Sequence, residues 1–214
     1  MVASATSLSG RSGLAWLYRL LDEVGPATAR LELGSRYGSL QILNGRDVTR
    51  DGLVQALRSA ATPACEAIDL LLMVHGEPDA LVLAASGGTG TDDVAATDLA
   101  RALSLVPELS GKLRLCYSTA CYGASHAQAL RGAGFRAVIG AKAINANSAT
   151  EVPILLHQWA KGADVASALR NADDPTLREA SDFLARTLEH FSDANSEKIL
   201  VGDQTITIDS LGAH

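Results

Sequence analysis

The stretch Leu70-Leu71-Leu72-Met73-Val74-His75-Gly76 decides how this chain is expected to fold. Its apolar residues follow one another without a polar interruption, which is typical of a strand buried on both faces of a sheet, and we expect that strand over 69–74. A second such run, 113–119, leads into Ala120-Cys121-Tyr122-Gly123. The sequence therefore places a histidine directly after one buried strand and a cysteine shortly after another, 46 residues later.

The elements around these two runs predict an α/β fold. We expect further strands over 80–84 and 136–141, and helices capped by Thr97 and over 125–131, 151–161 and 164–172. Strands that alternate with helices through 69–172 are typical of a sheet with right-handed parallel crossovers. Because such open sheets bind ligands at the carboxyl ends of their strands, His75 and Cys121 should face the same edge.

The outer segments are expected to complete a single domain over 1–214. Helical spacing from Leu14 to Leu21 predicts an N-terminal helix that ends near Gly25-Pro26. Alternation over 30–33 and 39–43 predicts a hairpin or two neighbouring strands with one solvent-exposed face. Thr49 should cap a helix that carries Leu53, Val54 and Leu57. A helix over 174–190 and a hairpin over 198–208, turning at Gly202-Asp203, are expected to follow.

The composition of the chain limits the classes of protein to which it can belong. The 214 residues are 47% hydrophobic and 20% charged, with a net charge of −6 and a pI of about 5.3, which fits a globular protein and gives no nucleic-acid footprint. No apolar run approaches the roughly 18 residues of a membrane span, and 1–12 has no leader pattern, so we expect no membrane partner and a cytoplasmic location.

Cysteine and histidine usage gives no sign of a metal or a cofactor. Cys65, Cys116 and Cys121 are an odd number without CxxC spacing, so they are expected to be reduced thiols. The histidines form no HExxH pair, and the glycine-rich segment 87–90 lacks the spacing of a phosphate-binding loop. We therefore expect no metal site and no cofactor, and interpret 87–90 as a turn.

A histidine and a cysteine at one sheet edge can carry nucleophilic chemistry, because imidazole can take the proton of a thiol and leave a thiolate. The alternatives are that His75 is a structural histidine and that Cys121 is a small buried apolar residue. Cys65 and Cys116 are expected to be structural. His126 should point away from the thiol and lie at the surface, and Asp92 and Asp93 should be solvated.

These motifs resemble the caspase-like fold, the clan of caspases, legumains, gingipains, separase and bacterial CHAT domains. The resemblance covers about 38–172 and is closest to CHAT domains, with N-terminal and C-terminal appendages. It implies a three-layer α/β sandwich with a mostly parallel sheet and helices on both faces. The matching residues are Val74-His75-Gly76, Thr119-Ala120-Cys121-Tyr122-Gly123, 134–140 and the helix over 162–170.

The resemblance implies roles for single residues. Cys121 matches the nucleophile and His75 the base, and the backbone N–H groups of Gly76 and Cys121 match the oxyanion hole. Gly76 would also leave room for substrate. No cofactor is implied, and the substrate would be a protein or peptide.

The chain departs from the family in the loop after strand 136–141. CHAT domains typically carry a Trp-Pro dipeptide and acidic residues there, whereas this chain has 142–148, KAINANS. With Asn145, Asn147 and Glu151 as substrate-binding residues, we expect basic or neutral polar side chains to be accepted before the scissile bond and acidic ones rejected.

The sequence thus predicts a cysteine endopeptidase or a related hydrolase that forms a thioester. Two alternatives stay open. The first is a catalytically silent caspase-like module that works with a partner protein in a larger assembly. The second is a doubly wound domain that binds a small ligand, in which 87–90 would hold an anion and Cys121 would be incidental.

Overall fold

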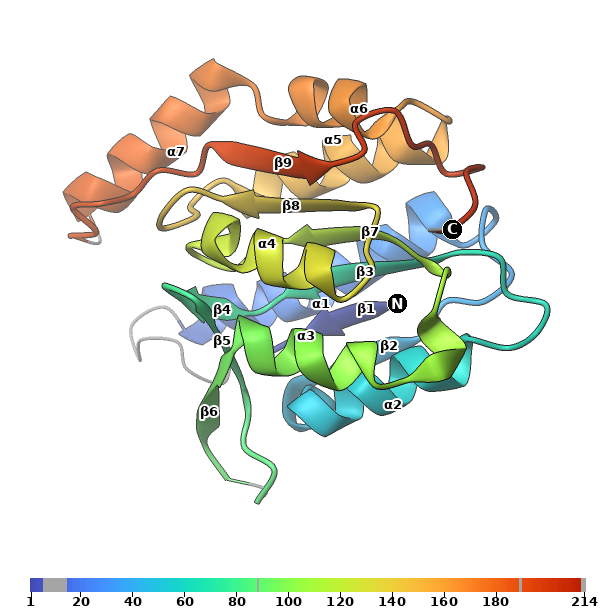
Figure 1. Cartoon of the computed structure of the whole chain (residues 1–214). Coiled ribbons are helices and arrows are strands. Elements are labelled where there is room, and N and C mark those ends of the chain that lie inside the picture. The colour runs from blue at the N-terminus through green and yellow to red at the C-terminus, as the bar shows by residue number, and fades with distance from the viewer. Residues whose placement is uncertain (6–14, 88, 189, 213–214) are drawn as a thin grey trace.

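A six-stranded sheet forms the centre of the protein (Figure 1). The computed structural model describes residues 1–5, 15–87, 89–188 and 190–212. The strand order is β2-β1-β3-β7-β8-β9, and all neighbours are parallel except β8 and β9, which are antiparallel. The strands are β1 (Val2–Ser4), β2 (Ile42–Asn44), β3 (Ile68–Met73), β7 (Leu113–Ser118), β8 (Ala137–Ala141) and β9 (Lys198–Gly202).

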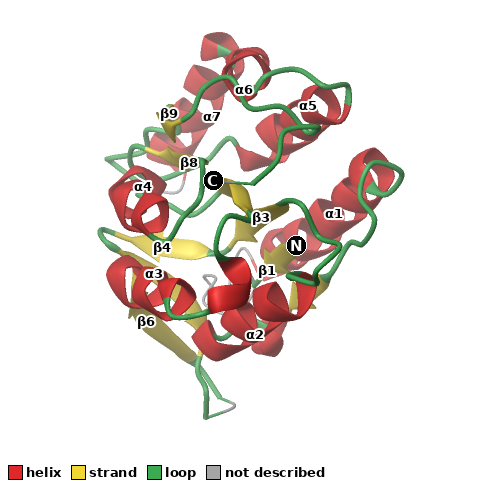
Figure 2. Cartoon of the chain, turned by 45° about the vertical axis from the view of Figure 1, so that its right-hand side comes forward, coloured by secondary structure: helices red, strands yellow, loops and turns green. Residues whose placement is uncertain are grey.

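Helices cover both faces of this sheet, as the sequence predicted (Figure 2). Alternate residues of β3 enter two separate cores, with Leu70 and Leu72 in one and Leu71 and Met73 in the other. The first core holds α2 (Arg50–Ala60), α3 (Ala96–Ser104) and α4 (Gly123–Gly132), and the second holds α1 (Ala15–Leu33), α5 (Ser148–Ala160) and α6 (Val165–Ala172). The fold is therefore a three-layer α/β sandwich. Short 3-10 turns lie at Gly45–Asp47 and Pro107–Leu109, and α7 (Pro175–Leu188) precedes β9.

A second, antiparallel sheet follows β3 directly. It consists of β4 (His75–Glu77), β5 (Ala80–Ala84) and β6 (Thr91–Ala95). The strand expected over 80–84 is confirmed, and the segment 85–90 connects β5 to β6, with Gly88 outside the described residues. This small sheet matters because its first residue is His75.

The N-terminal helix does not end at Gly25-Pro26, as the sequence suggested. Helix α1 continues through Pro26 to Leu33, so the segment expected as a strand over 30–33 is helical; Leu14 lies outside the described residues. A Cβ placed on Gly25 would lie 2.3 Å from the sulfur of Met73. Gly25 thus marks a close approach of the helix to the sheet, and the burial of Ala29 and Leu33 outweighs the local cost of the proline.

The start of the chain contains a strand that the sequence analysis missed. β1 lies between β2 and β3, and Val2, Ala3 and Ser4 are buried, although no strand was expected within 1–12. Residues 6–12 of that start lie outside the described residues. Three small residues are too short a run to be recognised by periodicity. The hairpin expected over 30–43 is therefore wrong, because only Ile42–Asn44 forms a strand and it pairs with β1 in parallel.

Other local predictions had mixed outcomes. The Thr49 cap is confirmed, since its hydroxyl oxygen accepts the N–H of Gly52 at 2.9 Å. Helix α3 begins at Ala96 with Ala95 at the cap, so Thr97 is no cap. The hairpin over 198–208 is wrong, because β9 pairs with β8 and Asp203 N–H is bound by Arg136 O at 2.8 Å.

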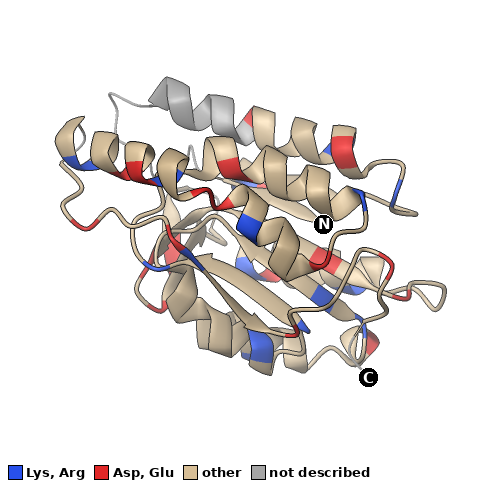
Figure 3. Ribbon diagram, turned by 90° about the horizontal axis from the view of Figure 1, so that it is seen from above, with Lys and Arg blue, Asp and Glu red and all other residues tan. Residues whose placement is uncertain are grey.

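Charged residues of both signs are interspersed along the ribbon (Figure 3), and the pair formed by Asp69 and Arg114 is buried between the layers. The guanidinium of Arg114 donates to both carboxylate oxygens of Asp69, each at 2.9 Å, and their side chains are 4% and 7% exposed. Trp159 Nε1 and Tyr37 OH also donate to this carboxylate. The pair joins β3 to β7. Within the described residues, no helix has the length and apolar character needed to cross a membrane.

We predict that Arg114→Met destabilises the protein by about 3–5 kcal/mol, because Asp69 would keep a buried charge without its partner. The matched control is Arg58→Met, which removes an exposed pair with Glu108 and should change stability by less than about 1 kcal/mol. Urea unfolding followed by circular dichroism measures both values. Equal effects of the two substitutions would contradict a structural role for the buried pair.

Candidate functional site

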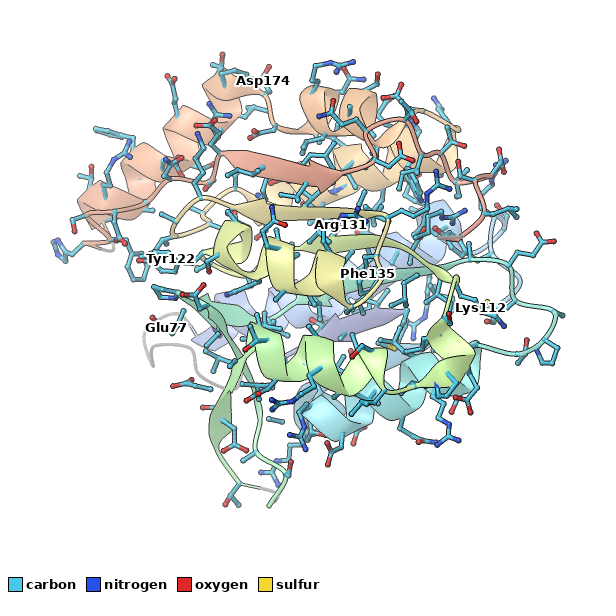
Figure 4. All side chains as sticks on the ribbon, in the orientation of Figure 1. Glu77, Lys112, Tyr122, Arg131, Phe135 and Asp174 are labelled. Atoms are coloured by element: carbon cyan, nitrogen blue, oxygen red, sulfur yellow. The ribbon has the colours of Figure 1, made fainter. Side chains whose placement is uncertain are left out.

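The residues after β3 and β7 leave the central sheet at the same edge. The two strands are parallel neighbours with Leu72 opposite Ser118, and the N–H of Thr119 donates to the carbonyl of Leu72 at 2.8 Å. Glu77 and Tyr122, which lie just beyond the two candidate residues, are found together at this end of the molecule (Figure 4). The expectation that the two strands end at one edge is confirmed.

Gly76 brings the histidine segment into direct contact with the cysteine segment. A Cβ placed on Gly76 would lie 2.3 Å from the carbonyl oxygen of Cys121 and 3.0 Å from the Cβ of Ala120. Only glycine allows this approach. Gly76 was expected to leave room for substrate, whereas the space at its Cα is occupied by the Cys121 backbone. His75, one residue earlier, is half-buried and pairs with Val82.

Cys121 lies half-buried in the turn between β7 and α4. Its sulfur accepts the backbone N–H of Asn145 at 3.5 Å. The next residue, Tyr122, has φ +54° and donates its N–H to Ala143 O at 2.8 Å, and these bonds fix the turn. Burial raises the pKa of the Cys121 thiol, and the nearby Glu77 carboxylate adds to this, while the Asn145 N–H and the Lys198 ammonium oppose it. The resting thiol is therefore protonated near neutral pH.

The Asn145 side chain belongs to a buried polar network. Its side-chain amide donates to Thr119 O at 2.9 Å and its side-chain oxygen accepts from Lys198 Nζ at 3.2 Å. Lys198 also pairs with Glu151, and both side chains are fully buried. The hydroxyl of Tyr117 donates to the other oxygen of Glu151 at 2.8 Å. The loop that contacts the Cys121 sulfur is thus held by a satisfied ion pair in the interior.

This network changes the expected roles of the substrate-binding residues. Glu151 has no exposed surface and both carboxylate oxygens are taken, so direct contact with substrate does not fit its position. Asn147 is also buried, and its side-chain oxygen accepts from Thr150 and Ser181. Asn145 is half-buried and spans Thr119 and Lys198. The side chains of Asn145 and Glu151 are thus bonded within the protein, whereas the buried Asn147 Nδ2 has no hydrogen-bond partner among the described residues.

His126 is buried, so its expected place at the surface is wrong. It lies on the side of α4 that faces the small sheet, where its Nε2–H donates to Glu77 O at 2.9 Å. Burial lowers the pKa of this imidazole. One residue earlier, the Ser125 hydroxyl accepts the N–H of Asp79 and donates to Tyr122 O, each at 2.8 Å.

Ser125 and His126 therefore bind the β4–β5 turn to the start of α4. In this way they hold the His75-Gly76 segment beside Cys121. The positioning role of these two residues was not predicted from the sequence. The available signal was a pair of polar side chains in the first turn of a helix that follows the cysteine.

The remaining candidates stay apart from this cluster. Cys116 is fully buried within β7 and Cys65 lies in the segment before β3, as the structural interpretation predicted. Asp92 and Asp93 are exposed on β6. Among the described residues, no three His, Cys, Asp or Glu side chains are placed to hold a metal ion.

Comparisons with known proteins do not assign a family. No protein-family model and no curated protein sequence matches the chain. Among solved structures, the chain is similar to protein GSU0716 from Geobacter sulfurreducens, with 10% sequence identity and a TM-score of 0.43, over 91% of this chain and 88% of that one.

We predict that alkylation of Cys121 by iodoacetamide speeds up continuously as pH rises through 9.0, the ordinary value for a thiol, because the raised pKa keeps the thiol protonated below it. Peptide mapping by mass spectrometry gives the rate at each cysteine, with Cys121→Ser as the control. Cys121 should react before the enclosed Cys116. A plateau already reached below pH 7 would contradict the protonated resting thiol.

Gly76→Ala should lower both stability and the Cys121 alkylation rate, because the added methyl would overlap the Cys121 carbonyl oxygen and force the two segments apart. We expect a loss of about 1–3 kcal/mol in a urea titration. The matched control is Gly132→Ala in α4, where no atom lies within 4 Å of the added Cβ. An unchanged Gly76→Ala protein would show that the contact is not needed.

Proposed function

We propose that the protein is a cysteine-dependent hydrolase of peptide bonds, in which Cys121 is the nucleophile and His75 the general base. The observation that carries this proposal is the backbone contact between Gly76 and Cys121 at the carboxyl edge of two parallel neighbouring strands. That contact keeps the residue after His75 against the cysteine backbone. It supports a short path between the imidazole and the thiol.

The proposed reaction proceeds through a thioester. His75 takes the proton from the Cys121 thiol as the sulfur attacks the carbonyl carbon, and the carbonyl oxygen becomes an oxyanion bound by the N–H groups of Gly76 and Cys121. The intermediate then expels the amine, which takes the proton from the His75 imidazolium. In the second half, His75 takes a proton from water as the water oxygen attacks the thioester. The thiol recovers the proton when the acid product leaves.

The environment of the sulfur explains why a base is required. Because burial raises the thiol pKa, little thiolate exists without a proton acceptor. The Asn145 N–H, 3.5 Å from the sulfur, is placed to stabilise the thiolate once it forms. The Lys198 ammonium adds a favourable charge from the interior. These features support a thiol that is activated only when His75 and substrate act together.

A second candidate is a catalytically silent module, because the Cys121 thiol is half-buried and burial raises its pKa, so that it is a poor nucleophile unless a base acts on it. The ligand-binding alternative has less support. The 85–90 turn lies beyond the Ala84–Thr91 pair, at the end of the β5–β6 hairpin that is remote from Glu77 and Ala80. We further propose a cytoplasmic location, because Cys65, Cys116 and Cys121 are all free thiols.

The test is a fluorogenic peptide-library assay on wild type, Cys121→Ala, His75→Ala and the double variant. Each single substitution should reduce the rate at least about 100-fold, and the double variant should lose scarcely more, because the two residues act as one unit. Cys65→Ala and His157→Gln are matched controls, since Cys65 lies before β3 and His157 pairs with Glu32 on the surface.

Thermal melts of each variant distinguish a loss of folding from a loss of catalytic activity. Activity that persists in Cys121→Ala would refute the mechanism. A folded wild type that cleaves no peptide, and whose Cys121 alkylation is unaffected by His75→Ala, would favour the silent module instead.

A further inference from the structure

A pocket of about 40 Å³ opens between α1 and α5 at the carboxyl edge of the central sheet. Met73, 5% exposed, and Val152, 6% exposed, are its most buried residues. Both helices contribute to the walls. The lining consists of Val24, Gly25, Thr28, Met73, Thr119, Ser148, Ala149, Val152 and Pro153.

Two residues of the pocket lining are close in sequence to the candidate catalytic residues, neither of which lines the pocket itself. Met73 precedes His75 by two residues and Thr119 precedes Cys121 by two residues, so each pair of Cα atoms is at most about 7 Å apart. Asn145 links the pocket lining to the thiol, because its side chain donates to Thr119 O and its backbone N–H donates to the Cys121 sulfur. A peptide whose carbonyl meets the sulfur can therefore place a neighbouring side chain in this pocket.

The chemistry of the lining selects for uncharged side chains. None of the described lining residues is ionisable, and the polar ones are the hydroxyls of Thr28, Thr119 and Ser148. The Thr119 hydroxyl already donates to Leu72 O. A lysine or aspartate side chain would lose its hydration here without an opposite charge. Glu151, which precedes the lining residue Val152, offers none, because its carboxylate is fully buried and bonded to Tyr117 and Lys198.

We propose that this pocket is the specificity pocket of the hydrolase and that it takes a small aliphatic side chain, such as that of alanine or valine, from the residue whose carbonyl Cys121 attacks. This inference rests on the proposed function. It replaces the expectation of basic or neutral polar residues. Met73 provides an adjustable contact, because its unbranched thioether can shift to fit different methyl groups.

A binding experiment in a variant without the nucleophile tests the selectivity of the pocket independently of catalysis. In the Cys121→Ala protein, peptides of the form acetyl-Gly-Gly-X-Gly-Gly-amide are titrated while the methyl signals of Met73 and Val152 are followed by NMR. With X as alanine or valine, both signals should shift at a dissociation constant at least about tenfold lower than with lysine or aspartate. Thr28→Asp, a substitution of similar volume, should reverse the preference toward lysine at least about tenfold.

The matched control is Thr62→Asp, on the exposed segment after α2, which should leave every affinity unchanged. Tighter binding of lysine or aspartate to the unmodified pocket, or a Thr28→Asp profile identical to that of the control, would overturn the proposal. Cleavage by the wild type is measured with the same peptides. Aliphatic selectivity in binding without any cleavage would leave the pocket in place and refute the proposed hydrolase instead.

Discussion

The parallel pairing of β3 with β7 is the constraint on which the rest of the structure depends. At one end of this strand pair, the buried ion pair between Asp69 and Arg114 joins the two strands. At the other end, the N–H of Thr119 donates to the carbonyl oxygen of Leu72. Because both strands run in the same direction, the segments that follow them must share one edge of the sheet. The glycine at position 76 then lets these two segments touch, with the Cys121 carbonyl where a side chain would otherwise lie.

The polar groups around the cysteine form two sets. On the side of the small sheet, Ser125 and the buried His126 hold the β4–β5 turn against the start of α4. In the interior, Lys198, Glu151 and Tyr117 hold the Asn145 loop, whose N–H meets the sulfur. Breaking a buried ion pair of this kind costs several kcal/mol, so the loop is fixed even though it has no regular secondary structure. The result is a rigid cysteine turn beside an apolar pocket.

The sequence predicted the central features because long apolar runs are strong signals. The strand over 69–74, the strand over 113–119 and the covering of both sheet faces follow from them. The failures have physical causes. β1 is only three residues long, and Gly25-Pro26 resembles a helix end but marks a close contact with Met73. Burial of Glu151 and His126 depends on partners that are distant in sequence, Lys198 and Glu77, which no local pattern reveals.

The most direct measurement is a crystal structure of the wild type with a peptide aldehyde that carries valine at its aldehyde end. The account predicts a bond between the Cys121 sulfur and the aldehyde carbon, the His75 imidazole within hydrogen-bond distance of the adduct, and the valine side chain against Met73 and Val152. The aldehyde oxygen should be bound by backbone N–H groups of Gly76 and Cys121. An adduct on another cysteine, or one with the His75 imidazole turned away from it, would contradict the account.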